Sequence, residues 1–264
     1  MQRLTVFGVT GRMGQSVLRA LVDTPGFALA GAVASAGSVR VGRDAAFEGP
    51  ESGVAVTADV DIALRTATVA IDFSLPLAVG AHAAACAQAR VPLVVGATGL
   101  EAEALAALRE AARKIPVLIA PNMSIGVALL ERLVRIASRS LGEDFDAEIL
   151  EAHHRMKRDA PSGTALHLGE AIASARGRPL DELAVLDRQT ETGPRRGGTI
   201  GFSVLRGGDI VGEHTVIFAG EGERLELMHR AGDRMIFARG ALRAAAWLVG
   251  RAPGSYGMQD VLDG

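Results

Sequence analysis

The sequence predicts an α/β protein. A doubly wound, Rossmann-like nucleotide domain with a parallel sheet is joined to a smaller α+β domain with a mostly antiparallel sheet. Three observations favour this fold class. An apolar strand, a glycine-rich turn and a helix open the chain; strands and helices alternate up to about residue 120; later strands follow one another with few helices between them. With 264 residues, 48% of them hydrophobic, the chain is long enough for two modest cores.

The chain opens with the pattern of a dinucleotide-binding unit. An apolar strand at 4–7 leads into the turn Gly8-Val-Thr-Gly-Arg-Met-Gly14, and apolar residues recur at helical spacing from Met13 onward. Gly11 would let phosphates approach the backbone, and Gly14 would allow the helix to pack closely. The alternative is a tight turn without a ligand, because the spacing is G-x-x-G-x-x-G and not G-x-G-x-x-G.

Strands and helices continue to alternate through the first half of the chain. Parallel sheets bind ligands at the carboxyl ends of their strands. Small and polar residues stand at three such ends, in 72–74, 96–99 and 121–124. The predicted strands are 27–34, 69–73, 92–96 and 116–120, and the predicted helices are 76–90 and 101–114.

The pattern changes after a helix predicted at 124–141. The strands that follow have only one helix between them, near 162–175, which indicates a mostly antiparallel sheet. The polar stretch 177–198 is expected to be a mobile surface loop, and a last helix is expected at 233–249. The strands predicted for this half are 147–152, 198–204, 213–218 and 224–228.

Lys157 is the most informative single residue, because lysine occurs in this chain only here and at Lys114. Arginine keeps its proton in proteins, whereas lysine can lose its proton when its surroundings lower its pKa. The neighbouring histidines, His153 and His154, exchange protons near neutral pH. Three cations between 155 and 158 would attract an anionic substrate. The alternative is that Lys157 is an ordinary solvated cation.

The segment after Lys157 is typical of a helix start. Pro161 suits a first turn, and Asp159 or Ser162 could cap the helix. The N–H groups at Gly163 and Thr164 would then form a site for a carboxylate or phosphate. An ordinary capped helix would explain these residues equally well, but it would not explain the basic run that precedes them.

Composition narrows the class of protein. A net charge of −2 and a pI near 6.3 argue against a nucleic-acid-binding protein. The single cysteine, Cys86, excludes an internal disulfide and indicates a reducing compartment. No signal peptide, membrane span or metal-ligand spacing is evident. We therefore expect a cytoplasmic protein with no nucleic-acid, membrane or metal partner.

Two motifs carry a family resemblance. The turn 8–14 and the segment Glu151-Ala-His-His-Arg-Met-Lys-Arg-Asp-Ala-Pro-Ser-Gly-Thr-Ala165 resemble the 4-hydroxy-tetrahydrodipicolinate reductase (dihydrodipicolinate reductase) family of lysine and diaminopimelate biosynthesis. The second motif is highly specific, and the similarity extends over essentially the whole chain. Further matching segments are 95–99, 120–126, 198–202, 208–215 and 260–263.

The resemblance implies an activity and an assembly. The family reduces a cyclic imine dicarboxylate with NADPH or NADH. Its members form homotetramers through the second domain, and the last helix returns to the first domain. We therefore expect a dinucleotide-binding domain at 1–124 and 234–264, and a substrate-binding and oligomerisation domain at 125–233.

The resemblance also implies residue roles. His153 is similar to the family's proton donor and acceptor, and Lys157 to its proton donor. The expected contacts of the substrate carboxylates are His154, Gly163 and Thr164. The expected cofactor contacts are Gly8, Val9, Thr10, Gly11, Arg12, Met13, Gly96, Ala97, Thr98, Ala120, Pro121, Asn122 and Met123.

Three positions depart from the family pattern. Many members have an acidic residue followed by arginine after the second strand, where this chain has Ala34 and Ser35. Leu75 stands where some members have an arginine, and Met156 where others have a histidine. A carboxylate at 34 would repel the 2′-phosphate of NADPH. Ser35 and Ser38 could donate to that phosphate, and Arg40 or Arg43 could reach it. We therefore expect use of both cofactors with a lean to NADPH.

Two other functions fit parts of the sequence. A dinucleotide-binding sensor needs only the glycine turn, whereas an enzyme also needs Lys157 and a proton-donating histidine. Another two-domain dehydrogenase, acting on an amino acid or a semialdehyde, is the second alternative. An acyl-enzyme route would need a positioned cysteine, and Cys86 lies in a predicted helix and not at a strand end.

Overall fold

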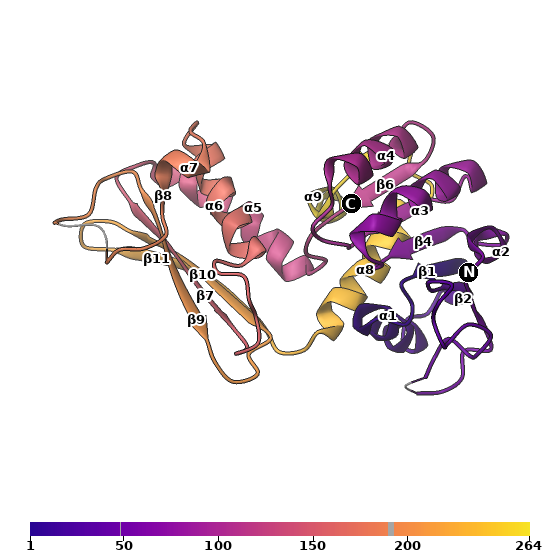
Figure 1. The fold of residues 1–264 in the computed structure, drawn as a ribbon. Coiled ribbons are helices and arrows are strands. Elements are labelled where there is room, and N and C mark those ends of the chain that lie inside the picture. Colours follow the sequence, from indigo (N-terminus) through magenta and orange to yellow (C-terminus); the bar gives the residue numbers. More distant parts are fainter. Residues whose placement is uncertain (48, 190–192) are drawn as a thin grey trace. The chain divides into compact units, whose positions relative to one another are not determined.

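The structure is a computed structural model that describes residues 1–47, 49–189 and 193–264 (Figure 1). These residues form two compact units. Unit 1 comprises Met1–Ile125 and Met235–Gly264, and unit 2 comprises Gly126–Arg234. Among the described residues, no helix is long and apolar enough to cross a membrane.

Unit 1 is a doubly wound α/β fold, as predicted. Its seven strands are all parallel and lie in the order β12-β6-β5-β4-β1-β2-β3. Figure 1 shows α2, α3 and α4 on one face of this sheet and α1 and α8 on the other. The strands are β1 (Gln2–Phe7), β2 (Phe27–Val33), β3 (Val56–Thr57), β4 (Val69–Asp72), β5 (Leu93–Val95), β6 (Pro116–Ile119) and β12 (Gly254–Tyr256). The helices are α1 (Arg12–Val22), α2 (Val60–Leu64), α3 (Pro76–Ala89), α4 (Ala102–Ala112), α8 (Met235–Leu248) and α9 (Met258–Asp263).

The glycine turn brings α1 against the end of β1. Gly8 has φ +71°, which favours glycine, and a Cβ on Gly14 would come within 2.4 Å of the Gly8 carbonyl oxygen. The buried Gln15 side chain donates hydrogen bonds to the carbonyl oxygens of Val9 and Ala45, both at 2.8 Å. The turn and the loop after β2 are therefore held together by one side chain.

Unit 2 is a five-stranded sheet with helices on one face (Figure 1). The strand order is β11-β10-β7-β9-β8. The core between α5, α6 and the sheet contains Val134, Ile149, Leu168, Ile172, Phe202 and Phe218. The elements are α5 (Ile125–Leu141), β7 (Asp146–His153), α6 (Gly163–Ala175), α7 (Leu180–Leu183), β8 (Ala184–Val185), β9 (Ile200–Arg206), β10 (Gly212–Ala219) and β11 (Arg224–Ala231).

Two details of the prediction for unit 2 are corrected. The sheet is mixed, because β10 pairs antiparallel with β7 and β11 whereas β9 pairs parallel with β7 and β8. The reason is that the chain leaves β7, crosses over through α6 and returns as β9 in the same direction. The expected loop at 177–198 contains α7 and β8, and Leu183 is buried in the core. Positions 190–192 of that loop lie outside the described residues.

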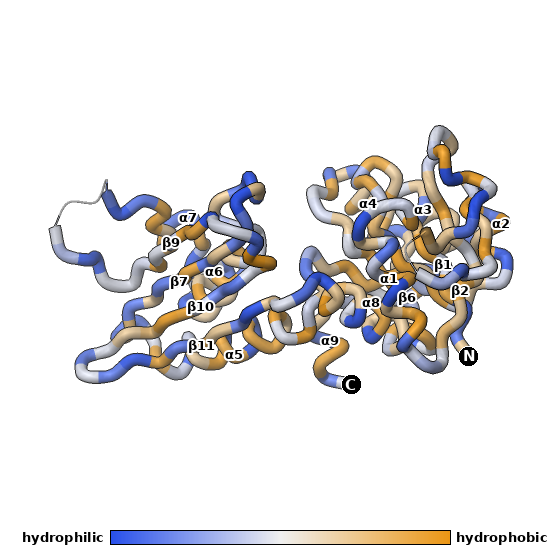
Figure 2. Tube along the Cα trace, turned by 90° about the horizontal axis from the view of Figure 1, so that it is seen from below, coloured by the Kyte–Doolittle hydropathy of each residue, from blue (hydrophilic) through white to orange (hydrophobic). Residues whose placement is uncertain are grey.

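The opposite face of the unit 2 sheet carries exposed hydrophobic side chains. Leu150, Thr215 and Met228 stand in register on neighbouring strands, and Leu150 and Met228 are 40% and 50% exposed. The alternate residues Ile149 and Val216 are buried in the core. Figure 2 shows that hydrophobic residues recur along β7 and β10. Both faces of the sheet are therefore partly apolar, although helices cover only one of them.

Candidate active site

A cavity of about 390 Å³ lies in unit 1 at the carboxyl ends of β1, β2 and β4. The expected cofactor residues Gly8, Thr10, Gly11 and Ser35 line this cavity. The turn before α1 presents a helix start at one wall, and glycine leaves its backbone accessible. These features fit a pyrophosphate with an adjoining nucleoside.

The other expected cofactor residues occupy the same edge of the sheet but lie outside the lining of this cavity. Gly96, Ala97 and Thr98 follow β5, and 120–123 follow β6. Arg12 is the exposed first residue of α1, and Met13 is its half-buried second residue. Val9 is fully buried; its N–H donates to the Val33 carbonyl oxygen.

Sequence reasoning missed a buried histidine in this cavity. His82 on α3 donates its Nδ1 hydrogen to Asp72 Oδ2 at 2.8 Å and stacks on the Phe7 ring at 4.2 Å. Asp72 Oδ1 also accepts the Ser74 N–H at 2.7 Å, so the pair fixes the turn after β4. The polar strand end at Asp72 was visible in the sequence. His82 was not, because one histidine in an alanine-rich helix has no recognisable spacing.

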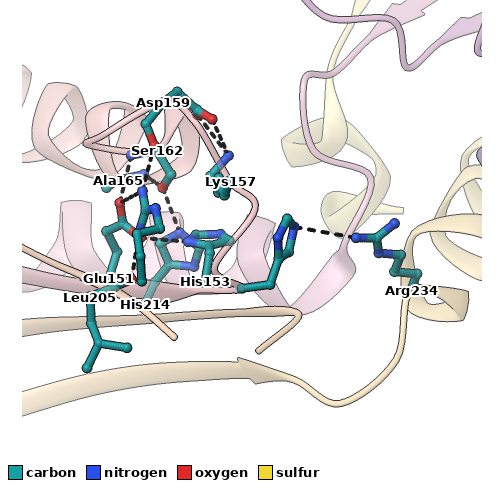
Figure 3. Close-up of polar contacts among 11 residues, drawn as sticks. Glu151, His153, Lys157, Asp159, Ser162, Ala165, Leu205, His214 and Arg234 are labelled. Carbon is teal, nitrogen blue, oxygen red and sulfur yellow. Dashed lines mark hydrogen bonds and ion pairs between the residues drawn. The ribbon is translucent and has the colours of Figure 1, made fainter. Parts of the chain in front are cut away.

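In unit 2, His153 is held from one side. It is the last residue of β7, it is buried, and its Nδ1 hydrogen is donated to Glu151 Oε2 at 2.6 Å (Figure 3). Burial lowers the pKa of His153, while the hydrogen bond and charge of Glu151 oppose that effect. His153 can therefore exchange a proton through Nε2.

Glu151 is fully engaged. Arg206 donates to both its carboxylate oxygens at 2.7 Å, and the Ser162 N–H donates to Oε1 at 2.9 Å. Burial alone would raise the pKa of Glu151, but the hydrogen bonds from Arg206, His153 and Ser162 outweigh it and the pKa lies below its usual value. The carboxylate thus stays ionised next to His153.

Lys157 lies in the turn after β7. Its N–H donates to the His154 carbonyl oxygen at 3.0 Å, and its ammonium group lies 2.8 Å from both carboxylate oxygens of Asp159. Asp159 therefore pairs with the lysine. Ser162, the other residue expected as a cap, is the N-cap of α6, where its Oγ accepts the Ala165 N–H.

The helix start differs from the prediction in one respect and leaves room for a ligand. Pro161 precedes the N-cap and is not in the first turn. Gly163 and Thr164 are the first two residues of α6, and a Cβ on Gly163 would meet no atom within 4 Å. An anion could therefore approach the positive end of the α6 dipole.

Two further side chains from distant parts of the chain join this cluster and were not predicted. His214 on β10 is buried, its Nε2 lies at hydrogen-bond distance from the Ser162 hydroxyl at 3.1 Å, and its ring lies edge-on to His153 at 5.2 Å. Burial lowers the pKa of His214 to about 4, which makes it neutral at pH 7. Arg234, at the end of unit 2, lies 3.5 Å from Nε2 of His154.

Two remaining expectations concern metals and cysteine. In the part of the chain that the structure describes, no group of three His, Cys, Asp or Glu side chains could hold a metal ion. Cys86 is buried in α3, and burial raises the pKa of its thiol, so the group is unsuited to act as a nucleophile.

Fold and site together define a two-unit protein of the dinucleotide-dependent oxidoreductase type, with acid–base side chains in the second unit. Family models described as "Dihydrodipicolinate reductase, N-terminus" and "Dihydrodipicolinate reductase, C-terminus" match residues 2–123 and 126–262. The chain therefore belongs to the dihydrodipicolinate reductase family.

Individual relatives agree with this assignment. Proteins named 4-hydroxy-tetrahydrodipicolinate reductase are 51% identical in Thiobacillus denitrificans, over 98% of each chain, and 53% identical in Anaeromyxobacter dehalogenans, over 99% of this chain and 98% of the relative. The dipicolinate-bound dihydrodipicolinate reductase of Paenisporosarcina sp. TG-14 has a TM-score of 0.80 and 25% identity, over 98% of this chain and 99% of that one. An amine dehydrogenase from Mycobacterium smegmatis shares the fold, with a TM-score of 0.62 and 15% identity over 98% of this chain and 95% of that one.

Proposed function

We propose that this chain is an NAD(P)H-dependent 4-hydroxy-tetrahydrodipicolinate reductase, which forms tetrahydrodipicolinate in diaminopimelate and lysine biosynthesis. One observation carries the proposal. The chain is about half identical to reductases of this name. In this chain His153, which is hydrogen-bonded to the Glu151 carboxylate, and Lys157 lie close to the start of α6. A sensor that only binds a dinucleotide has no need for that cluster.

The residues of unit 1 fit the adenine dinucleotide. Gly8 and Gly11 bring backbone without a side chain to the wall of the cavity, and Ser35 lines the same cavity. The nicotinamide supplies a hydride when it is bound. The protein contributes by holding the pyrophosphate at the start of α1 and by fixing the turn after β4 through Asp72 and His82.

The residues of unit 2 fit the substrate. One carboxylate of the cyclic imine lies at the α6 start, against the N–H groups of Gly163 and Thr164, and His154 contacts the same ligand. The 4-hydroxyl group leaves as water, together with a proton from the neighbouring ring carbon, and a conjugated imine results. Hydride addition to that imine builds negative charge on the ring, which one proton must neutralise. His153 at Nε2 and Lys157 at its ammonium group are the proton donors.

Cofactor choice is a finer part of the proposal. The enzyme uses both NADPH and NADH, with a lean to NADPH, because the lining at 34–36 includes no carboxylate. The Arg40 guanidinium stacks over the Phe47 ring at 4.1 Å, in the loop that follows β2. A single partly exposed cation of this kind contributes less than about 1 kcal/mol, so the preference is small.

The assembly and compartment complete the proposal. The enzyme is a homotetramer joined through unit 2, and the exposed apolar face around Leu150 and Met228 supplies a surface that a second copy can cover. Equilibrium sedimentation giving the mass of one chain would contradict the tetramer. The enzyme works in the cytoplasm, which suits the free thiol of Cys86.

The decisive experiment measures NAD(P)H oxidation with the freshly formed condensation product of pyruvate and aspartate semialdehyde. The proposal predicts steady turnover that requires this substrate. Tight cofactor binding without turnover would identify a sensor. Turnover only with free amino acids or semialdehydes would identify another dehydrogenase. The variant His153→Gln, combined with Lys157→Ala, is the control for background oxidation.

A further inference from the structure

We propose that Glu151 and Arg206 are positioning residues for His153: they fix the ring so that Nε2 is its proton-transfer atom. The proposal rests on the proposed role of His153 as a proton donor. It assigns a function to the buried Glu151 carboxylate and the half-buried Arg206 guanidinium, neither of which lines the nucleotide cavity.

The first argument is the geometry of the Glu151 carboxylate. Its side chain is 1% exposed, and it receives hydrogen bonds from His153, Arg206 and Ser162. The arginine fork matches both oxygens, which is the strongest and most directional form of this ion pair. A carboxylate held on two sides cannot rotate, and so it holds the His153 ring in one orientation.

The second argument is the second attachment of Arg206. The same guanidinium donates to the Asp159 carbonyl oxygen at 2.6 Å and to the Leu205 carbonyl oxygen at 2.8 Å. Arg206 therefore links the end of β9 to the turn that carries Lys157. Both proposed proton donors depend on one arginine for their placement.

The third argument concerns the other ring nitrogen of His153. Since Nδ1 donates to an ionised carboxylate, the neutral ring has its lone pair at Nε2, and the second proton binds there. A Cβ atom on Gly212, the first residue of the neighbouring strand β10, would come within 3.1 Å of Nε2 of His153. Glycine at 212 keeps that nitrogen free of a neighbouring side chain.

The fourth argument is electrostatic. The charged and titratable groups facing His153 are Glu151 on β7, Arg206 on β9, His214 on β10 and Lys157 in the turn. Burial lowers the pKa of His153; Glu151 raises it; Lys157 and Arg206 lower it. His214 is neutral above its pKa of about 4. Removing the glutamate charge and removing the arginine charge must therefore shift the titration of His153 in opposite directions.

The test is the titration of His153 in the whole protein, without substrate. Histidine labelled with ¹³C at Cε1 gives six signals, and loss of one signal in His153→Gln assigns that residue. The variants are Glu151→Gln, Arg206→Met and the conservative Arg206→Lys. The control is Arg135→Met, which removes an arginine from the ion pair with Glu131 on α5. Folding of each variant is checked by its thermal unfolding midpoint.

The expected result is a lower His153 midpoint in Glu151→Gln and a higher one in Arg206→Met, with partial return in Arg206→Lys and no change in Arg135→Met. The alkaline limb of the kcat profile, where a proton donor loses its proton, should move with each midpoint, and kcat should fall about 10- to 100-fold in Glu151→Gln. The KM for the cofactor should stay within about twofold.

Two other outcomes have separate meanings. If both variants titrate as the parent does, or shift in the same direction, the pair is only a structural anchor for α6 and the inference is wrong. If a variant is too unstable to titrate, the remaining one still decides, because each predicts a shift of defined sign. Near-normal turnover in His153→Gln would instead overturn the proposed role of His153, whatever the titration shows.

Discussion

The ammonium group of Lys157 lies 2.8 Å from both carboxylate oxygens of Asp159, two residues further along the chain. The hydrogen bond from the lysine lowers the pKa of Asp159. The carboxylate side is 57% exposed, so the pair is only weakly stabilising and can open when an anionic ligand competes for the ammonium group. This arrangement holds the proposed proton donor close to the α6 start without fixing it there permanently.

Lys157→Ala should abolish most of the turnover and leave cofactor binding intact. A single proton donor contributes about 10²- to 10⁴-fold to the rate, and the predicted cofactor residues lie in unit 1. Steady-state kcat and the dissociation constant of NADPH check the two parts. Lys114→Ala is the matched control, since Lys114 is the other lysine of the chain and is exposed in unit 1. Similar turnover in both variants would mean that Lys157 is a surface cation.

The fold of unit 1 could be predicted because the residues that determine its first elements are close together in the sequence. A buried run, a glycine turn and an apolar helix follow one another within about 20 residues, and β1 and α1 form where expected. β3 and β12 were missed because they contain two and three residues, too few for a periodic pattern. The parallel pairing of β7 with β9 was missed because pairing depends on the path of the intervening chain, which hydrophobic spacing does not encode.

Changes at the α6 start should affect the substrate much more than the cofactor. Gly163→Ala adds a methyl group where the protein leaves at least 4 Å of space, so folding should be unaffected while a bound carboxylate is crowded. Thr164→Val removes a hydroxyl donor. We expect the substrate KM to rise at least about tenfold in Thr164→Val, since one hydrogen bond to a charged group contributes about 1.5–3 kcal/mol. In Gly163→Ala the substrate KM should rise because the added methyl group crowds the carboxylate.

The control for these variants is internal. KM for NADPH and the thermal unfolding midpoint should both stay at their parent values. Equal increases in the two KM values would indicate that the substitutions damage folding. An unchanged substrate KM in both variants would contradict the proposed anion site at the start of α6.

The candidate site was predictable only along one stretch of chain. His153, His154, Lys157 and the helix start at Ser162 lie within ten residues and share a visible basic pattern. Arg206 and His214 reach the same place from β9 and β10, more than 50 residues later. No sequence spacing connects either residue with the segment 153–162, and only the strand order of the sheet places them next to His153.

Cofactor choice should respond weakly to the arginines after β2. The parent should use both cofactors with a small excess of kcat/KM for NADPH, because 34–38 contains no carboxylate to repel a 2′-phosphate. Arg40→Ala, which also removes the stacking on Phe47, or Arg43→Ala should lower that excess by less than about fivefold. The measurement is kcat/KM for both cofactors in the three proteins. A strong preference for NADH in the parent that neither substitution changes would contradict this prediction.

Replacing His214 should flatten the acid side of the stability curve. Its pKa is about 4 in the folded protein, against 6.5 for an unperturbed histidine. Above pH 6.5 the side chain is neutral in both states and has no effect. As pH falls from 6.5 to about 4, the unfolded chain binds a proton that the native protein does not, so stability is lost, by at most about 3 kcal/mol. In His214→Gln, whose amide group can still form a hydrogen bond with the Ser162 hydroxyl, this part of the loss disappears. Urea unfolding at pH 7.5 and pH 4.5, at one protein concentration, measures the difference.

The control variant His167→Gln makes the same substitution at a half-exposed histidine, and its stability should change with pH as that of the parent does. If His214→Gln also loses as much stability as the parent on acidification, His214 is not the titrating group and the acid sensitivity belongs to its neighbours.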